Sequence, residues 1–156
     1  DNIYYLRNRY VFLGAGAEAV QESTKSALIG YTASDVLIQK YTRLSPMETL
    51  EKAVQLLQNT QEQGFVVVEN DQAIGVLTRK ELIKGLTAYG NNSRVSDIMR
   101  NDFAIVAPNT PLQQVYEKLV SNNSQLAAVL DNGQLTGIVT VKGINEMIMV
   151  TKGRKK

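Results

Sequence analysis

The heptapeptide Gly75-Val76-Leu77-Thr78-Arg79-Lys80-Glu81 decides the fold, because a second copy of its pattern, Gly137-Ile138-Val139-Thr140-Val141-Lys142-Gly143, occurs 62 residues further along the chain. The same offset relates Ser34-Asp35-Val36 to Ser96-Asp97-Ile98. From Ser34 to Leu82, twelve of forty-nine positions are identical to their counterparts without a gap, where ordinary composition gives about three. The chain is therefore a tandem duplication.

Each copy carries the same succession of apolar patterns. Apolar residues at helical spacing come first. They are Leu50, Ala53, Val54 and Leu57 in the first copy, and Leu112, Val115, Tyr116 and Leu119 in the second. Apolar runs around a short polar turn then predict a β-hairpin over residues 65–78 and again over residues 126–140. The second turn contains Asn132-Gly133, which is typical of a tight two-residue hairpin. Helices are expected over residues 79–89 and 141–149.

Each copy is thus expected to form a β-α-β-β-α unit. Such a unit is too short to enclose a core alone, so we expect the two to pack on each other as a pseudo-twofold pair of the α/β (α+β) class. The expected repeats span residues 33–92 and 93–150. A linker and helix over residues 1–32 precede them, and a basic tail over residues 151–156 follows.

Two helix ends are predicted from capping residues. The amino-terminal helix is expected over residues 16–29 and ends at Gly30, a residue that favours helix termination. Ser45-Pro46-Met47-Glu48 resembles a capping box with proline at the first helical position, and it predicts the start of the first helix of repeat one there or two residues later.

The composition excludes several classes of enzyme. The 156 residues include no cysteine and no histidine, which excludes thiol nucleophiles, Ser-His-Asp catalysis and metal sites built from imidazole or thiolate ligands. Hydrophobic residues make up 44% of the chain and charged residues 21%, which is typical of a globular protein. We therefore expect a binding protein rather than an enzyme, with no catalytic residue, no metal site and no catalytic cofactor.

The formal net charge of +2 is concentrated at one end of the chain. Four basic residues without an acidic neighbour stand in the carboxyl-terminal stretch, namely Lys152, Arg154, Lys155 and Lys156. The remaining sequence has a small excess of acidic residues and no basic stripe with interleaved aromatic residues. No nucleic-acid partner is therefore expected.

A dinucleotide-binding pattern occurs before the repeats. Residues 10–19 match a strand followed by G-x-G-x-x-A, and Asp35 lies downstream at about the distance of a ribose-binding acid. However, no second apolar strand ends at Asp35, and the same residue recurs as Asp97 without a glycine motif. We therefore interpret Gly14 and Gly16 as small residues that permit close helix packing.

The duplicated heptapeptide has the chemistry of an anion site. A threonine that ends a strand and opens a helix places its hydroxyl beside free backbone N–H groups, and Thr78 and Thr140 occupy such positions. Nearby basic side chains that could bind phosphate are Arg79, Lys80 and Lys142. Glu81 follows Thr78 by three residues and could accept hydrogen bonds from a ribose. Alternatively, the two threonines only cap helices.

These motifs together resemble the CBS-domain pair, also called a Bateman module. The resemblance rests on the duplicated heptapeptide and on residues 36–37, 42–46, 65–68, 97–99, 105–108 and 127–129. It covers residues 33–149, and it implies two β-α-β-β-α units that are joined through their sheets. It also implies clefts that often bind an adenine nucleotide such as ATP, ADP or AMP.

The resemblance further implies which residues hold that ligand. In the family, the threonine of the motif contacts phosphate, an aspartate binds the ribose, and apolar residues before the proline and in the central strand enclose the base. The corresponding residues here are Thr42, Leu44, Phe65 and Thr78 for one cleft, and Ile105, Ala127 and Thr140 for the other. Glu81 and Gly143 stand where the aspartate is expected, so we expect the nucleotide beside Thr78 rather than Thr140.

A narrower resemblance concerns the parent protein. Residues 12–19, which run directly into the repeats, are similar to the segment that joins the membrane and CBS regions in site-2-protease-like zinc metalloproteases. This resemblance implies a regulatory part on the cytoplasmic side of a membrane protein, with the membrane protease domain as a partner and the HExxH catalytic part outside this chain.

A homodimer through the CBS helices is also expected. The apolar helix faces available for it are Leu82, Ile83 and Leu86 in the first repeat, and Met147, Ile148 and Val150 in the second. The alternative function for the whole chain is a ligand-free CBS scaffold for dimerisation and docking.

Overall fold

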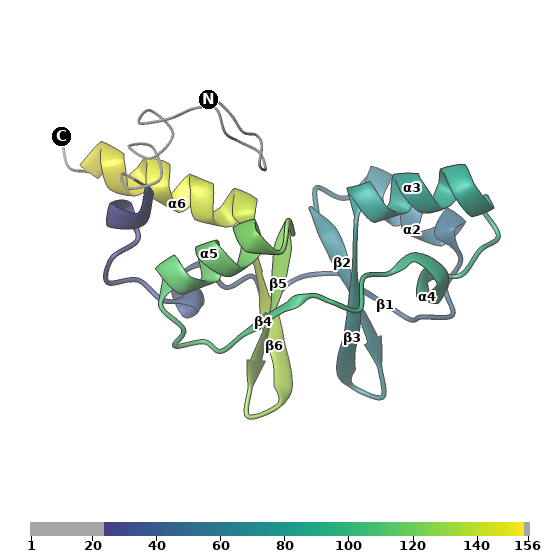
Figure 1. Cartoon of the computed structure of the whole chain (residues 1–156), viewed down its shortest axis with the longest axis horizontal. Coiled ribbons are helices and arrows are strands. Elements are labelled where there is room, and N and C mark those ends of the chain that lie inside the picture. Colours follow the sequence, from purple (N-terminus) through teal and green to yellow (C-terminus); the bar gives the residue numbers. More distant parts are fainter. Residues whose placement is uncertain (1–23, 155–156) are drawn as a thin grey trace.

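Two units of the same design form the protein, and they are described over residues 24–154 in a computed structural model (Figure 1). The first unit contains β1 (Arg43–Leu44), α2 (Leu50–Asn59), β2 (Gly64–Glu69), β3 (Gln72–Thr78) and α3 (Arg79–Tyr89). The second contains β4 (Ala104–Val106), α5 (Leu112–Ser121), β5 (Leu126–Asp131), β6 (Gln134–Thr140) and α6 (Val141–Arg154). The predicted pair of β-α-β-β-α units is therefore confirmed.

Each unit holds a three-stranded mixed sheet. The strand orders are β1-β2-β3 and β4-β5-β6, with the first pair parallel and the second pair antiparallel in both sheets. Two-residue turns close the hairpins. Both central residues of each turn have positive φ, 52° and 62° at Asn70 and Asp71, and 51° and 80° at Asn132 and Gly133. This geometry is that of the tight hairpin predicted from Asn132-Gly133.

The two sheets meet at the middle of the molecule, where the hairpins lie side by side (Figure 1). A cluster of four buried residues, one from each central or hairpin strand, joins them: Val66, Val76, Leu126 and Ile138. The helices cover the opposite sheet faces, so β2 and β5 are enclosed on both sides and their first four residues are buried. Enclosure on both sides explains why these strands are continuous apolar runs rather than alternating ones.

The units exchange their leading segments. The short helix η2 (Ala33–Val36) precedes the first unit but packs on the second, where the Ala33 and Ser34 N–H groups donate to the Thr110 and Pro108 carbonyls at 2.9 Å each. The helix α4 (Val95–Ile98) precedes the second unit but packs on the first, with equivalent bonds to Glu48 and Pro46. We call residues 33–38 and 95–100 the crossing segments.

Each crossing segment ends by pairing with the last strand of the opposite unit. Ile38 and Ile138 exchange backbone hydrogen bonds of 2.9 and 3.0 Å, and Arg100 and Val76 exchange bonds of 2.8 and 3.0 Å. The backbones come so close that a Cβ on Gly137 would lie 2.6 Å from the Ile38 carbonyl oxygen. The glycine of the duplicated motif is therefore required by the passage of the crossing segment.

Some sequence expectations need correction, and others lie outside the described residues. The last helix, expected over residues 141–149, continues to Arg154 and includes the first part of the expected basic tail. The capping box at residues 45–48 is wrong, because α2 begins at Leu50 with Thr49 as its N-cap, and the Thr49 hydroxyl accepts from Lys52 N at 3.2 Å. Of the expected amino-terminal helix, residues 24–27 are helical and Gly30 has a φ of 88°. The rest of that helix, the glycine motif over residues 14–19 and the segment over residues 12–19 lie outside the described part.

Replacement of Gly137 tests the close approach. Gly137→Ala should lower the free energy of unfolding by about 1–3 kcal/mol, because the added Cβ overlaps the Ile38 carbonyl. Denaturant unfolding followed by circular dichroism measures this change. Gly153→Ala is the matched control, since nothing lies within 4 Å of a Cβ there, and it should leave stability unchanged or raised. Equal midpoints for wild type and Gly137→Ala would contradict the argument.

Candidate functional site

The crossing segments create two related hollows between the units. Each hollow lies at the end of β3 or β6, the strand that carries the duplicated motif. The end of a crossing segment and the loop before the central strand of the other unit complete its lining. We call the first the Thr78 cleft. It consists of a cavity of about 530 Å³ and a neighbouring one of about 410 Å³, and Lys80 and Asn123 line both. The second is the Thr140 cavity of about 200 Å³.

Thr78 is bonded to Glu81 in the first cleft. Thr78 is 5% exposed, and its backbone N–H and its hydroxyl both donate to Glu81 Oε1, at 2.9 and 2.5 Å. This reciprocal arrangement of N-cap and third helical residue satisfies a backbone donor at the start of α3. The capping alternative from the sequence is thus realised at Thr78. Any ligand that takes the Thr78 hydroxyl has to compete with the Glu81 carboxylate.

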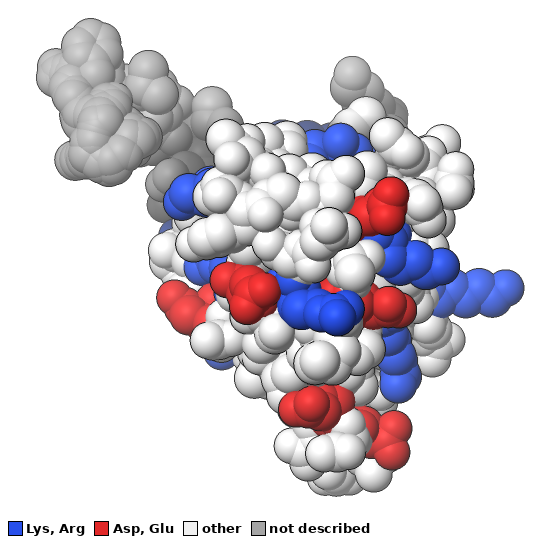
Figure 2. Space-filling view, turned by 90° about the vertical axis from the view of Figure 1, so that its right-hand side faces the viewer, with Lys and Arg blue, Asp and Glu red and all other residues white. Residues whose placement is uncertain are grey.

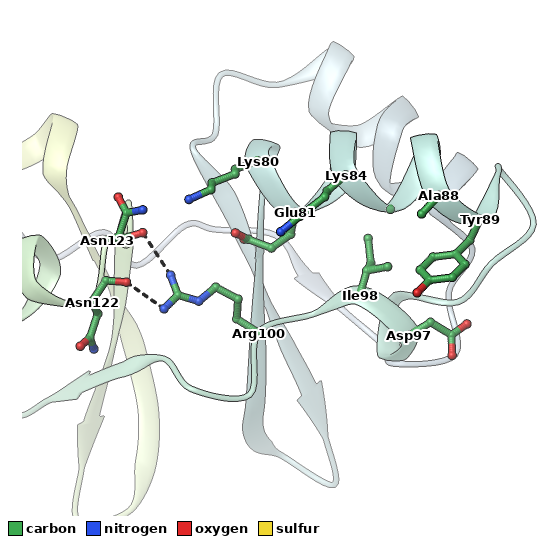
Figure 3. A pocket seen from close by; sticks show the side chains of 11 residues that line it. Lys80, Glu81, Lys84, Ala88, Tyr89, Asp97, Ile98, Arg100, Asn122 and Asn123 are labelled. Atoms are coloured by element: carbon green, nitrogen blue, oxygen red, sulfur yellow. Dashed lines mark hydrogen bonds between the residues drawn. The ribbon is translucent and has the colours of Figure 1, made fainter. Parts of the chain in front are cut away.

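Arg100 links the first cleft to the second unit. Its guanidinium donates to the Asn122 and Asn123 carbonyls at 2.8 and 3.1 Å, at the carboxyl end of α5 (Figure 3). A cation at that end of a helix is favoured by the helix dipole. Lys80 and Lys84 line the same cavity from α3, and neither forms a hydrogen bond or an ion pair with any residue in the described part. Two basic side chains there are thus available to an anion.

The acidic residues of that cavity are already engaged. Glu81 accepts from Thr78, and Asp97 Oδ2 accepts from the Arg94 N–H at 3.0 Å at the far end of the hollow (Figure 3). Three basic and two acidic side chains therefore line the larger cavity, and the hydrogen bonds of the two acids are local. The cavity can attract an anionic group.

Thr140 is arranged differently from Thr78. Thr140 is 3% exposed, and its hydroxyl accepts from the Gly143 N–H at 2.9 Å. This is the bond of a helix N-cap, so the capping alternative is realised here as well, and the proton of the hydroxyl is not used in that bond. Lys142 and Lys40 line the cavity together with two acidic residues, Glu62 and Glu146. The Thr140 cavity therefore has a free hydroxyl donor and no net charge in its lining.

The remaining site residues expected from the family resemblance lie elsewhere. Leu44, Phe65 and Ala127 are at most 2% exposed and belong to the cores of their units. Thr42 donates from its backbone N–H and its hydroxyl to Glu62, and Ile105 lines a separate cavity of about 630 Å³ between β4 and α5. Their contact with a ligand stays a prediction.

The structure brings together Thr78, Arg79, Lys80 and Glu81 in one place, and Thr140 and Lys142 in the other. The segment that precedes each unit lies beside the threonine of the other repeat. Ile38, Lys40 and Tyr41 line the Thr140 cavity, and Arg100 lines the Thr78 cleft. The crossing of the segments causes this exchange. Sequence reasoning missed Arg100, Lys40, Tyr41 and Glu62, because their place depends on long-range packing of loops and crossing segments. It also missed Lys84 and Glu146, which follow Lys80 and Lys142 by four residues on the same helices and which helical periodicity could have indicated.

No group of three or more aspartate, glutamate, histidine or cysteine residues within residues 24–154 could hold a metal ion. No helix in this range has the length and apolar character needed to cross a bilayer. At the outer end of the first unit, basic and acidic side chains are interspersed rather than separated (Figure 2).

The described part of the chain thus consists of two duplicated units with exchanged leading segments and paired hollows. The sequence model of a family described as CBS domain matches residues 33–88 and 95–149, one match for each unit. The chain therefore belongs to the CBS domain family and is a tandem CBS pair. Such pairs are regulatory ligand-sensing modules.

Curated relatives share this part of their chains. An A-adding tRNA nucleotidyltransferase of Geobacter sulfurreducens is 24% identical over 109 residues, which is 70% of this chain and 12% of that protein. An inosine-5'-monophosphate dehydrogenase of Thermoplasma acidophilum is 27% identical over 110 residues, 70% of this chain and 22% of that protein. The CBS domain-containing protein YhcV of Bacillus subtilis is 23% identical over 120 residues, and 86% of it is matched, against 74% of this chain. The chain spans 12–26% of the length of the first four curated relatives.

Solved structures share the fold. CBSX2 in complex with AMP superposes with a TM-score of 0.68 at 23% identity, over 79% of this chain and 99% of that one. The CBS domain pair of protein MJ0100, in complex with 5'-methylthioadenosine and S-adenosyl-L-methionine, gives a TM-score of 0.69 at 20% identity, over 80% of this chain and 98% of that one. At these identities the likeness establishes the fold.

Proposed function

We propose that this CBS pair senses an adenine nucleotide, ATP, ADP or AMP, and binds its phosphate in the Thr78 cleft. The observation that carries the proposal is the pair of lysines, Lys80 and Lys84, that face this cleft without a partner in the described residues, next to the Arg100 guanidinium. Phosphate oxygens are strong acceptors for such cationic donors.

Of the two hollows, cavity size favours the Thr78 cleft. Ligand sites commonly measure about 300–1,000 Å³, and the larger cavity of the Thr78 cleft, about 530 Å³, falls within that range. The Thr140 cavity, about 200 Å³, falls below it. The structural likeness to CBSX2, whose structure contains AMP, and to the MJ0100 pair, whose structure contains two adenosine derivatives, supports an adenine-containing ligand.

Removal of one lysine tests the phosphate site. Lys80→Ala should weaken ATP binding about ten- to a hundredfold, because a hydrogen bond to a charged phosphate is lost. Titration calorimetry with ATP, ADP and AMP measures the affinities. Lys52→Ala, which removes an exposed lysine on α2 away from both hollows, is the control and should leave them unchanged.

Absence of nucleotide binding would contradict the proposal. If millimolar nucleotide gives no heat in calorimetry and no shift in the thermal unfolding midpoint, the chain is a ligand-free scaffold for dimerisation and docking. The bonds from Thr78 to Glu81 favour that alternative, since the threonine already has a structural role without a ligand.

We also propose a homodimer through the CBS helices. An apolar groove of about 370 Å³ runs between α2 and α3, with Leu57, Leu82, Ile83 and Leu86 among its lining residues. Ile83 is 57% exposed, whereas Leu82 is buried within the chain. In the second unit Ile148 is buried, and Met149 and Val150 are the exposed apolar residues of α6. Ile83, Met149 and Val150 thus present apolar surface to a second copy.

A charge in the groove should disrupt this dimer. Ile83→Glu should shift the mass measured by light scattering from dimer to monomer, because a carboxylate would have to be buried at the interface. Met47→Glu, at a 62% exposed position in the turn before α2, is the control and should keep the dimer. A monomeric wild type at high concentration would contradict the proposal.

We propose, finally, that the parent protein is a membrane-embedded zinc metalloprotease that this module regulates from the cytoplasmic side. The similarity of residues 12–19 to the joining segment of site-2-protease-like enzymes supports this proposal. In the full-length protein, cleavage of a membrane substrate should change when ATP is added, and Lys80→Ala should reduce that response. An upstream sequence without HExxH in an apolar segment would contradict the proposal.

A further inference from the structure

The carboxyl-terminal end of α6 carries apolar side chains that the core leaves uncovered. Ile144 and Ile148 face inward and are buried in the core of the second unit. Met149 and Val150, which directly follow Ile148, are 72% and 54% exposed. Adjacent exposed residues of this size are typical of an interaction surface. The end of α6 thus has an outer apolar face as well as an inner one.

A further exposed apolar residue belongs to the same end of the molecule. The short helix over residues 24–27 lies beside the carboxyl end of α6 (Figure 1), and Leu28 and Ile148 belong to one buried cluster. Ile29 stands in the turn that follows this short helix, and it is 65% exposed. The described part of the chain therefore begins and ends at one end of the second unit, and both of its ends expose apolar side chains there.

Positive charge accompanies this apolar face. Lys152 is exposed half a helical turn beyond Val150, and it forms no ion pair among residues 24–154. In the sequence it is followed by three further basic residues, Arg154, Lys155 and Lys156, and no acidic residue follows Glu146. Four of the last five residues are thus basic. A run of this kind is attracted to an anionic surface.

The acidic residues around α6 are engaged locally and do not cancel this charge. Glu146 stands one turn before the apolar face and lines the Thr140 cavity, where Lys142 balances its charge. Asp35 lies in η2, which packs against α6, and its Oδ2 accepts from a backbone N–H of its own turn at 2.8 Å. Glu117 on α5 pairs with Lys25 at 3.1 Å. The carboxyl-terminal end of α6 therefore keeps a net positive charge.

A second copy of the chain is the other candidate to cover this face, and the charge argues against it. Two copies that met through Met149 and Val150 on a twofold axis would bring their basic ends together, where like charges repel. The apolar groove between α2 and α3 belongs to the first unit, so a dimer through that groove does not need α6. An anionic lipid surface, in contrast, attracts the basic residues and offers an apolar layer to the side chains beside them.

From these observations we infer that the carboxyl-terminal end of α6, together with Ile29, binds the surface of an anionic lipid bilayer. Met149, Val150 and Ile29 enter the boundary between headgroups and acyl chains, and Lys152 and the basic residues after it supply positive charge to the lipid phosphates. None of these residues lines the Thr78 cleft or the Thr140 cavity, so the inference does not depend on nucleotide binding.

Co-sedimentation with lipid vesicles tests the inference. The 156-residue chain should bind vesicles of phosphatidylcholine mixed with phosphatidylglycerol, and it should not bind vesicles of phosphatidylcholine alone. Binding should weaken as salt is added, because salt screens charges at the surface. No binding to either kind of vesicle, or equal binding to both, would overturn the inference.

Two variants separate the apolar contribution from the basic one. Met149→Gln combined with Val150→Gln should weaken binding to the anionic vesicles about tenfold, because apolar surface is no longer buried in the bilayer. Lys152→Ala should weaken it about fivefold, because one cation near the surface is lost. The matched controls are Met47→Gln, at an exposed apolar position of the first unit, and Lys52→Ala, at an exposed position on α2. Neither control should change vesicle binding.

Other roles of this face give different results. If the double glutamine variant lowers the mass measured by light scattering and leaves vesicle binding unchanged, a second copy covers the face and the inference is wrong. If Lys152→Ala weakens vesicle binding and the double glutamine variant does not, the apolar residues do not enter the bilayer and the inference is equally wrong. In the Ile83→Glu background, where the groove dimer is disrupted, the double glutamine variant should still weaken vesicle binding. Thermal unfolding midpoints should match the wild type for the glutamine and alanine variants, because the replaced side chains are exposed.

Discussion

The close passage of each crossing segment over a glycine is the contact on which the rest of the structure depends. At Gly137 the opposite backbone leaves no room for a side chain, and at Gly75 the Met99 sulfur would lie 2.7 Å from an added Cβ. This approach allows Ile38 to pair with Ile138 and Arg100 to pair with Val76. Through these pairs each unit completes the core of the other, and the two sheets are held against each other at the centre.

The same contact determines where ligands can bind. Each crossing segment ends beside the last strand of the opposite unit, so its final residue and the residues that follow it reach the hollow at the end of that strand. Arg100 thereby reaches the Thr78 cleft, and Lys40 and Tyr41 reach the Thr140 cavity. The two hollows share one plan, but the side chains that fill it differ in charge and in hydrogen-bonding capacity. A duplicated fold thus offers two chemically distinct sites.

Most of the fold could be predicted from the sequence, because the offset of 62 residues aligned two sets of helix and hairpin patterns that supported each other. The Asn132-Gly133 turn and the start of α3 at Arg79 followed from local chemistry. The start of α2 did not, since Thr49 competes with Ser45 as a cap and only the packing of the preceding turn decides between them. The site was predicted in part. The motif residues and the local bonds of Thr78 and Thr140 follow from the repeated pattern. The residues that reach the two hollows from the crossing segments, such as Arg100 and Tyr41, depend on long-range crossing that no local pattern encodes.

The exchange of leading segments also determines what a chain with a single repeat would need in order to fold. A chain with only one repeat would expose the surface that its missing segment should cover, and its own segment would have nothing to cover. Two identical copies would resolve both problems by lending segments to each other around a true twofold axis. Both hollows of that symmetric assembly would then be the same. Joining the copies in one polypeptide removes this constraint, so that tyrosine can stand at residue 41 while phenylalanine stands at residue 103.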